Sequence, residues 1–129
     1  MKPKNIGTHN RILIIDNDPR FFTELVEETG KIGLSCSFQE AKTFFQAVES
    51  LFSGMFELVL LDFPGIRGPY LLNLALSRKI PVIILASPTM FPLEARHLQE
   101  RGIKEIFPKE NLEDIVSALG VFFQLHQPR

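Results

Sequence analysis

The sequence predicts a single α/β domain in which a doubly wound parallel sheet of five strands is flanked by five helices. Short apolar runs of strand length alternate along the chain with longer stretches whose apolar residues recur every three or four positions. The 129 residues, 45% of them hydrophobic, can bury one substantial core and are too few for two ordinary domains. We therefore expect one domain over residues 11–125, with a flexible tail at 1–10 and a short tail at 126–129.

The expected strands are five short apolar runs. In order they are RILII, LSCSF, ELVLL, PVIIL and KEIF, at residues 11–15, 34–38, 57–61, 81–85 and 104–107. Their length favours strands over helices, and their alternation with helical stretches is typical of a parallel sheet.

The first two expected helices are clearly marked. Asp18 is a good N-cap for the first, because Pro19 follows at the first helical position, and Gly30 or Gly33 is expected to close it. The second helix carries an aromatic stripe that we expect to lie flat on the sheet as core. The apolar residues of the first are Phe21, Phe22, Leu25 and Val26, and those of the second are Ala41, Phe44, Phe45, Val48, Leu51 and Phe52.

The remaining three helices differ in the strength of their periodicity. The third is short and begins after Gly68 and Pro69, whereas the fourth, near residues 93–99, has the weakest pattern of the set. The fifth has a clear apolar face that we expect to be buried. The apolar positions are Leu71, Leu72 and Ala75 in the third helix, and Leu112, Ile115, Val116, Leu119, Phe122 and Phe123 in the fifth.

Composition and charge exclude several classes of protein. A formal net charge of −1 provides no broad basic field for nucleic acid or anionic lipid. No apolar run approaches the roughly 20 residues needed to cross a bilayer, so no membrane association is expected. Cys36 is the only cysteine, which excludes a disulfide within the chain, and the Met-Lys-Pro-Lys start lacks an apolar signal segment. We expect a cytoplasmic protein.

Polar residues with useful chemistry stand where the expected strands end. Asp16 and Asp18 follow ILII, Asp62 follows LVLL, and Ser87 and Lys109 follow the last two strands. In an open parallel sheet the functional loops lie outside the carboxyl ends of the strands, so these side chains are expected to converge. Carboxylates bind hard cations through oxygen, and an ammonium offsets the charge of a phosphoryl group. The sequence therefore predicts a phosphate and metal site.

The order of these motifs resembles the receiver domain of bacterial response regulators, over about residues 11–125. The segments IIDND, LLDFPG, PVIILAS and the Lys109 region occupy the places of that family's acidic pair, phosphoacceptor, hydroxyl and lysine. The resemblance implies a flavodoxin-like sheet with strand order 2-1-3-4-5. It also implies a signalling role in a two-component phosphorelay rather than an enzyme, with self-phosphorylation and slow autodephosphorylation as the chain's own reactions.

By this resemblance, Asp62 accepts a phosphoryl group from a histidine kinase or a phosphotransfer protein. Asp16 and Asn17 would belong to the shell of a Mg²⁺ ion, which Asp62 itself and the backbone carbonyl of Pro64 would complete. A carboxylate that attacks an anionic phosphoryl group needs its charge offset. The cation would do so together with the ammonium of Lys109.

Several departures from the family pattern fall in this one site. Asn17 replaces the usual second carboxylate, which should lower the affinity for metal. Ala86 stands in the hydroxyl position, and Ser87, one position later, would supply the hydroxyl if the strand has already ended. The loop after the phosphoacceptor is shorter than usual, and Pro108 precedes Lys109 instead of following it.

Two alternatives from other classes stay open at the level of sequence. A pseudo-receiver would keep the fold as a protein-docking surface and would have lost the switch, because the departures cluster in one site. A small haloacid-dehalogenase-like phosphatase would use the Asp-x-Asp of ILIIDND, with VIILAS and Lys109 imitating its next motifs. That family needs a later acidic pair at a strand end, whereas the acids after Lys109 are Glu110, Glu113 and Asp114.

The expected partners are proteins: a histidine kinase or phosphotransfer protein on one side and an effector on the other. The resemblance also implies a homodimer or effector surface on the fourth helix, the fifth strand and the fifth helix. The stretch FPLEARHLQERG supplies charged side chains that could pair across such an interface. Tyr70, beside the loop after Asp62, is expected to pack against its neighbours or to gate the site, and its exposure distinguishes the two roles.

Overall fold

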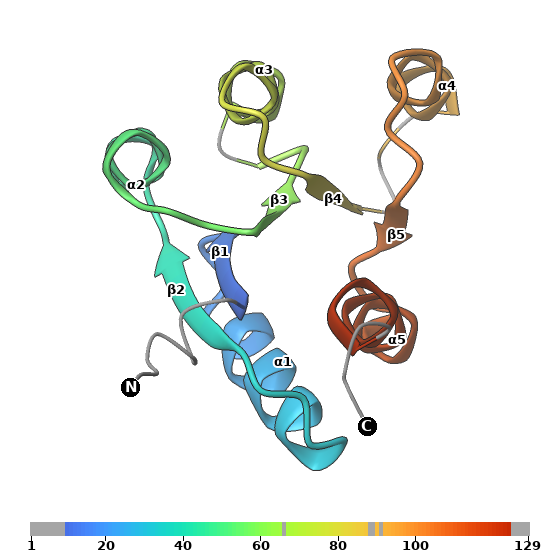
Figure 1. The fold of residues 1–129 in the computed structure, drawn as a ribbon. Coiled ribbons are helices and arrows are strands. Elements are labelled where there is room, and N and C mark those ends of the chain that lie inside the picture. The colour runs from blue at the N-terminus through green and yellow to red at the C-terminus, as the bar shows by residue number, and fades with distance from the viewer. Residues whose placement is uncertain (1–9, 66, 88–89, 91, 125–129) are drawn as a thin grey trace.

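The chain forms one open sheet of five parallel strands with helices on both faces, as the computed structural model in Figure 1 shows. The structure describes residues 10–65, 67–87, 90 and 92–124. The elements in chain order are β1 (Arg11–Ile15), α1 (Pro19–Lys31), β2 (Ser37–Ala41), α2 (Phe44–Ser53), β3 (Leu58–Asp62), α3 (Gly68–Ser77), β4 (Val82–Ala86), α4 (Pro92–Glu100), β5 (Ile106–Pro108) and α5 (Leu112–Gln124).

The order across the sheet is β2-β1-β3-β4-β5, which confirms the predicted flavodoxin-like class. Apart from Asn10, the two expected tails lie outside the described residues. Within the described part of the chain, no helix combines the length and the apolar character that a membrane span requires.

The sheet divides the core into two layers. Successive strand residues face opposite ways, so Leu13 and Ile15 of β1 pack in the layer of α2, α3 and α4, whereas Ile12 and Ile14 pack in the layer of α1 and α5. All four side chains are fully buried. Figure 1 shows the same division, with α2, α3 and α4 on one side of the sheet and α1 and α5 on the other. Burial on both faces explains why these strands are continuous apolar runs.

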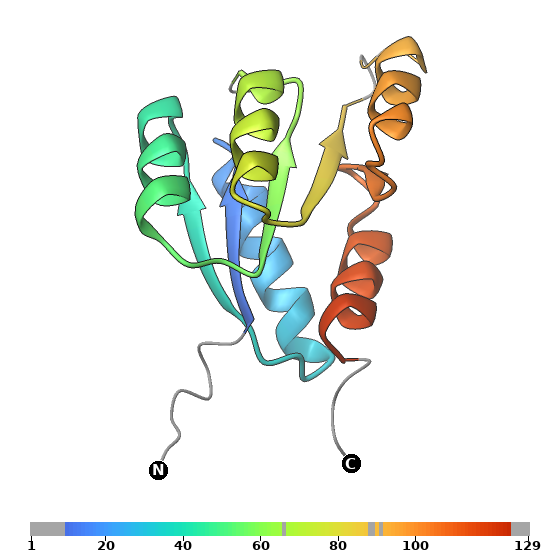
Figure 2. The same ribbon diagram turned by 45° about the horizontal axis from the view of Figure 1, so that its top comes forward.

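The strands all point the same way, so their carboxyl ends meet at one edge of the sheet (Figure 2). β3 lies between β1 and β4, with Ile15 opposite Leu61 and Asp62 opposite Leu85. The residue that follows β1 and the last residue of β3 are therefore neighbours at this edge.

The two edge strands begin later than the sequence predicts. β2 runs over Ser37–Ala41 rather than 34–38, and β5 over Ile106–Pro108 rather than 104–107. β2 alternates exposed and half-buried side chains before its buried last residue. The bounds of such a strand follow from its pairing with the buried β1. The prediction depends on apolar content, which is therefore a poor guide to the bounds of an edge strand.

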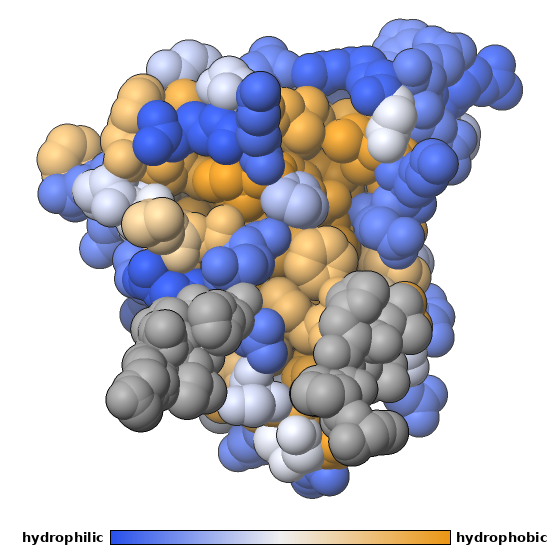
Figure 3. All heavy atoms as spheres, in the orientation of Figure 1, coloured by the Kyte–Doolittle hydropathy of each residue, from blue (hydrophilic) through white to orange (hydrophobic). Residues whose placement is uncertain are grey.

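The prediction that the aromatic stripe of α2 lies flat on the sheet is wrong for two of its residues. Phe45 is 74% exposed and Phe52 is 55% exposed, whereas Ala47 and Leu51 are buried. Since a helix turns about 100° per residue, Phe45 lies on the opposite side from Ala47. Ala41, expected in this helix, ends β2 instead. Apolar side chains accordingly reach the surface over α2, at the left of Figure 3.

The first helix begins as predicted. Oδ1 of Asp18 accepts a hydrogen bond from the N–H of Arg20 at 3.0 Å, and Pro19 occupies the first helical position. α1 ends at Lys31, and Gly33 follows with a φ of 75°, a left-handed conformation that favours glycine. The helix that starts at Asp18 therefore has a fixed origin beside the carboxyl end of β1.

The connection from β3 to α3 is a compact turn that depends on two glycines. A Cβ on Gly68 would collide with the backbone of Phe63, and no side-chain rearrangement relieves a clash with backbone. A Cβ on Gly65 would lie 2.8 Å from Oδ2 of Asp62, and the N–H of Gly65 donates to the carbonyl of Asp62 at 3.1 Å. The turn therefore packs closely against the end of β3.

We predict that Gly68→Ala lowers the free energy of unfolding by about 2–3 kcal/mol, because the added methyl forces the turn away from Phe63. The matched control is Gly120→Ala in α5, where a Cβ would lie 3.9 Å from Cδ1 of Ile32. It should raise the free energy of unfolding by up to about 1 kcal/mol through helix propensity. Urea unfolding of both variants checks this, and equal effects would contradict the account of the turn.

Candidate functional site

The candidate site lies at the carboxyl edge of the sheet, where the ends of three strands contribute charged side chains. Asp16 directly follows β1, Asp62 is the last residue of β3, and Lys109 directly follows β5. The backbone N–H of Lys109 donates to the carbonyl of Ala86 at 2.9 Å, which continues the pairing of β5 with β4 by one residue. The sheet therefore fixes the backbone from which the lysine side chain starts.

The ammonium of Lys109 lies among three carboxylates of the described chain. Its Nζ is 2.8 Å from Oδ2 of Asp16 and donates a hydrogen bond to Oδ1 of Asp16 at 3.0 Å. The same Nζ is 3.6 Å from Oδ2 of Asp62 and 3.8 Å from Oδ2 of Asp18. We call Asp16, Asp18, Asp62 and Lys109 the acidic cluster. Its carboxylates outnumber its ammonium, so the cluster is negative overall.

Asp16 is the anchor of the acidic cluster because it is completely buried. Its Oδ1 also accepts a hydrogen bond from the N–H of Asp18 at 2.8 Å. Its Oδ2 accepts no well-aligned hydrogen bond from the described residues, and the ammonium 2.8 Å away compensates its charge. A buried carboxylate requires such a partner, so Asp16 depends on Lys109.

The surroundings shift the titration of both Asp62 and Lys109. Burial, followed by repulsion from Asp16, raises the pKa of the Asp62 carboxyl above its ordinary value, and the attraction of Lys109 only partly offsets this. For Lys109, burial alone would lower the pKa. The hydrogen bond to Asp16 and the charges of the three carboxylates outweigh that effect, so the pKa of Lys109 is raised. The ammonium therefore stays protonated at neutral pH.

The other residues expected at the site lie around this cluster. Ser87 is half-buried and lines a pocket of about 320 Å³ beside Lys109. Asn17 and Pro64 are both exposed, Asn17 next to Asp16 in the chain and Pro64 in the turn after Asp62. The pocket is lined by Asp18, Arg20, Phe21, Glu24, Ser87, Lys109 and Glu110.

Asp18, expected both at this edge of the sheet and as a helix cap, fills both roles: it caps α1 through Oδ1 and faces Lys109 through Oδ2. Two other contributions to the site are not evident from the sequence. Phe21, expected as core, places its ring centre 5.4 Å from Nζ of Lys109, a cation–π contact. Gly65 lies against Asp62, as described above.

The oxygen donors suit a hard divalent cation in kind and in charge. Carboxylate oxygens of Asp16 and Asp62 are the ligands that Mg²⁺ prefers, and the surplus negative charge would favour a cation. Among the described residues, however, no group of three histidine, cysteine or acidic side chains is arranged to hold a metal ion. The ammonium of Lys109 already pairs with the same carboxylates, so a cation would compete with it for them.

Solved structures of response regulators share this architecture. The receiver domain of the Francisella response regulator 1452 has 16% sequence identity and a TM-score of 0.72, over 92% of this chain and 100% of that one. The chain has the receiver-domain fold. A two-component response regulator from Clostridium difficile gives 18% identity and a TM-score of 0.71, over 93% of this chain and 100% of the other.

A third structure, the phosphorylated cyanobacterial phytochrome response regulator RcpA, gives 16% identity and a TM-score of 0.65, over 94% of this chain and 97% of that one. No family model matches the sequence, and no curated protein matches it. At these identities the likeness concerns the receiver fold alone. The role of each site residue therefore depends on the geometry of this chain.

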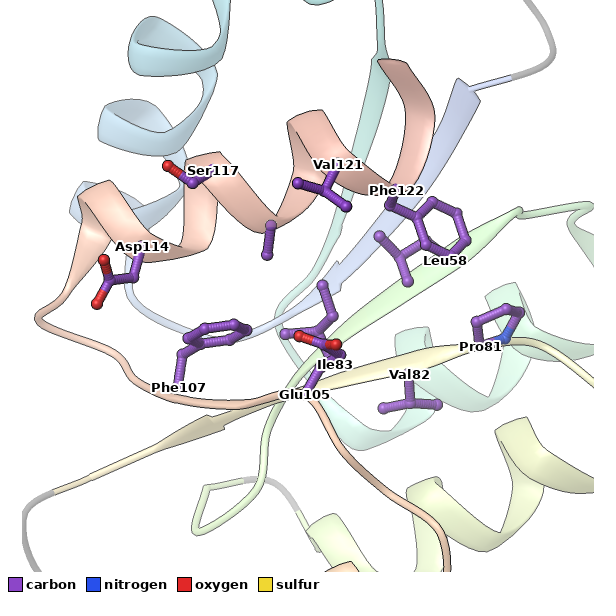
Figure 4. A pocket seen from close by; sticks show the side chains of 11 residues that line it. Leu58, Pro81, Val82, Ile83, Glu105, Phe107, Asp114, Ser117, Val121 and Phe122 are labelled. Carbon is purple, nitrogen blue, oxygen red and sulfur yellow. The ribbon is translucent and has the colours of Figure 1, made fainter. Parts of the chain in front are cut away.

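This receiver fold has a second, larger pocket away from the acidic cluster. The pocket, of about 410 Å³, lies between α5 and the strands, and includes the residues at which β3 and β4 begin (Figure 4). Phe122, expected in the buried face of α5, is 38% exposed and lines it together with Val121. Glu105 and Asp114 are its acidic residues. The full lining is Leu58, Pro81, Val82, Ile83, Glu105, Phe107, Asp114, Ser117, Ala118, Val121 and Phe122.

We predict that Lys109→Met lowers the free energy of unfolding by about 3 kcal/mol, because it leaves the buried carboxylate of Asp16 unpaired. The double variant Asp16→Asn/Lys109→Met should recover most of this loss, since it removes both charges. Urea unfolding of the four members of the cycle measures the coupling. A Lys109→Met variant as stable as the unmodified chain would contradict the anchoring role of the pair.

Proposed function

We propose that the chain is a receiver-like signalling domain of a two-component phosphorelay, in which Asp62 accepts a phosphoryl group from a histidine kinase or a phosphotransfer protein. The observation that carries this proposal is the position of Asp62. Its Oδ2 is 3.6 Å from the ammonium of Lys109, at the carboxyl edge of the sheet and next to a buried carboxylate. A nucleophilic oxygen and a fixed positive charge thus lie side by side.

The chemistry follows from these groups. An oxygen of Asp62 attacks the phosphorus of a phosphohistidine or of acetyl phosphate, a P–O bond to Asp62 forms, and the bond from phosphorus to the donor breaks. The electron pair leaves with the donor, and Asp62 becomes an acyl phosphate. The raised pKa of Asp62 makes its carboxylate a stronger base than an exposed aspartate. Lys109 offsets charge on the phosphoryl oxygens.

We propose that Asp16, Asn17, Asp62 and the carbonyl of Pro64 would hold a Mg²⁺ ion in this site. When bound, the ion would neutralise charge that one ammonium cannot balance against three carboxylates and a phosphoryl group. The hydroxyl of Ser87 lines the same pocket as Lys109, so we assign it to the phosphoryl oxygens. The chain itself would then catalyse no reaction of a separate substrate beyond its own phosphorylation and slow autodephosphorylation.

A second candidate is a pseudo-receiver that binds partners without phosphorylation. One observation favours it: the ammonium of Lys109 lies closer to Asp16 than to Asp62. A haloacid-dehalogenase-like phosphatase has less support. Of the acids after Lys109, Asp114 lines the pocket under α5 and belongs to that helix, not to a strand end near Asp16.

The proposed partners are a phosphodonor protein, an effector and, on the surface of α4, β5 and α5, a second copy of the chain. The exposed Val121 and Phe122 and the pocket they line offer apolar surface for such contacts. With a net charge of −1, we propose no nucleic-acid or membrane partner. A phosphorelay partner would place the chain in the cytoplasm.

Intact mass after incubation with Mg²⁺ and acetyl phosphate tests the proposal. We expect a gain of one phosphoryl group, because Asp62 is the nucleophile and Lys109 and the cation offset the charge. The Asp62→Asn variant and a metal-free sample are the controls, and both should show no gain. No gain in the unmodified chain would contradict the proposal and would favour the pseudo-receiver.

A further inference from the structure

Helices α2 and α3 together leave four large apolar side chains on the surface. Two are the exposed phenylalanines of α2, one follows that helix, and one is the sole tyrosine of the chain. Met55 is 77% exposed and Tyr70 is 50% exposed. Two arginines at the ends of α3 border these side chains. We define the α2–α3 surface as Phe45, Phe52, Met55, Tyr70, Arg67 and Arg78.

Two rings of this surface, those of Tyr70 and Phe52, are held in place by contacts at the two ends of α3. At the start, the guanidinium of Arg67 lies 4.5 Å from the ring centre of Phe44 and 5.6 Å from that of Tyr70. The two ring centres are themselves 5.5 Å apart. At the end, the guanidinium of Arg78 lies 5.1 Å from the ring centre of Phe52 and donates to the carbonyl of Phe52 at 3.2 Å. Tyr70 and Phe52 are therefore held in position before any partner binds.

The core does not account for this apolar surface. Ala47 and Leu51 of α2 and Leu71 and Leu72 of α3 already fill the space against the sheet. Single exposed apolar residues are ordinary, whereas a patch that extends over two neighbouring helices is typical of a binding site. Figure 3 shows apolar surface over α2, with hydrophilic atoms close by. Ordered aromatic rings bordered by arginine are the side chains that dominate binding energy in protein interfaces.

The charges of this region select the kind of partner. The two helices and the residues that flank them carry two exposed carboxylates, Glu49 and Glu57, and four exposed cations, Lys42, Arg67, Arg78 and Lys79. A second copy of the same surface would bring these cations together, which disfavours self-association. Nucleic acid needs a denser array of cations than this, and the chain as a whole is slightly negative. Complementary charge is therefore expected on an acidic protein segment.

We propose that the α2–α3 surface binds an acidic amphipathic helix of a partner protein. The apolar face of that helix packs on the rings and Met55, and its carboxylates pair with Arg67, Arg78 and Lys79. This binding mode requires an apolar stripe at helical spacing and flanking carboxylates, and nothing else of the partner. It does not require phosphorylation of Asp62, so its outcome is independent of the proposed function.

The test uses fluorescence anisotropy with a labelled amphipathic peptide of about five helical turns, built from leucine, alanine and glutamate. A second peptide carries lysine in place of glutamate. Phe45→Ala/Met55→Ala changes the two most exposed apolar side chains of the surface and should not affect folding, which thermal unfolding verifies. The matched control is Ile32→Ala, whose side chain is 56% exposed on another part of the molecule.

We expect the glutamate peptide to bind the unmodified chain more tightly than the lysine peptide. Phe45→Ala/Met55→Ala should weaken that binding by about tenfold or more, and Ile32→Ala by less than about twofold. Lys79→Glu should weaken it as well, whereas Lys104→Glu, an equal change of charge at another exposed lysine, should not. The preference for the glutamate peptide and the loss of binding in Lys79→Glu should both diminish as salt concentration rises.

Four outcomes would overturn the proposal. They are no binding of the glutamate peptide, stronger binding of the lysine peptide, and equal losses in Phe45→Ala/Met55→Ala and Ile32→Ala. The fourth is evidence that a different molecule occupies the α2–α3 surface. This would be a dimer in sedimentation equilibrium that Phe45→Ala/Met55→Ala abolishes, or binding of a single-stranded RNA probe that the same variant abolishes.

Discussion

The pairing of the buried carboxylate of Asp16 with the ammonium of Lys109 is the interaction on which the rest of the site depends. These residues are 93 positions apart in the chain, and the lysine side chain joins the end of β5 to the end of β1. Because an unpaired buried charge costs several kcal/mol, the pair fixes both strand ends together with β3 and β4 between them. The N–H of Asp18, hydrogen-bonded to Asp16, ties the start of α1 to the same point.

Because Lys109 pairs mainly with Asp16, it balances the negative charge of the Asp62 carboxylate only in part. Lys109 is closer to Asp16 than to Asp62, and burial and the repulsion of Asp16 raise the pKa of the Asp62 carboxyl. A carboxylate in this situation is a good nucleophile, and a phosphoryl group attached to it adds further negative charge. One arrangement thus supports both the proposed reactivity of Asp62 and the proposed cation. With the neutral Asn17 as a ligand in place of a carboxylate, that cation would be weakly bound.

The sequence predicts the central strands of the sheet better than its edge strands and the orientation of its helices. The runs of β1, β3 and β4 are apolar because both faces are buried, so periodicity identifies them and strand ends locate Asp16 and Asp62. The edge strand β2 takes its bounds from its partner, which lies far away in the chain. Helical periodicity gives the α2 stripe but not how the helix is rotated on the sheet, so the exposure of Phe45 was not predictable. The contact between Oδ2 of Asp18 and the ammonium of Lys109 depends on the fold, because Lys109 follows β5 at the other end of the chain.

The most direct test of this account is the pKa of the Asp62 carboxyl, measured by ¹³C NMR titration of the metal-free protein. The ammonium of Lys109 interacts with three carboxylates and most strongly with Asp16. If this is so, the pKa of the Asp62 carboxyl lies above the ordinary 3.8. It should then fall in the Asp16→Asn variant, because the repulsion disappears and Lys109 becomes available to Asp62. A pKa at or below 3.8 that Asp16→Asn leaves unchanged would contradict the account.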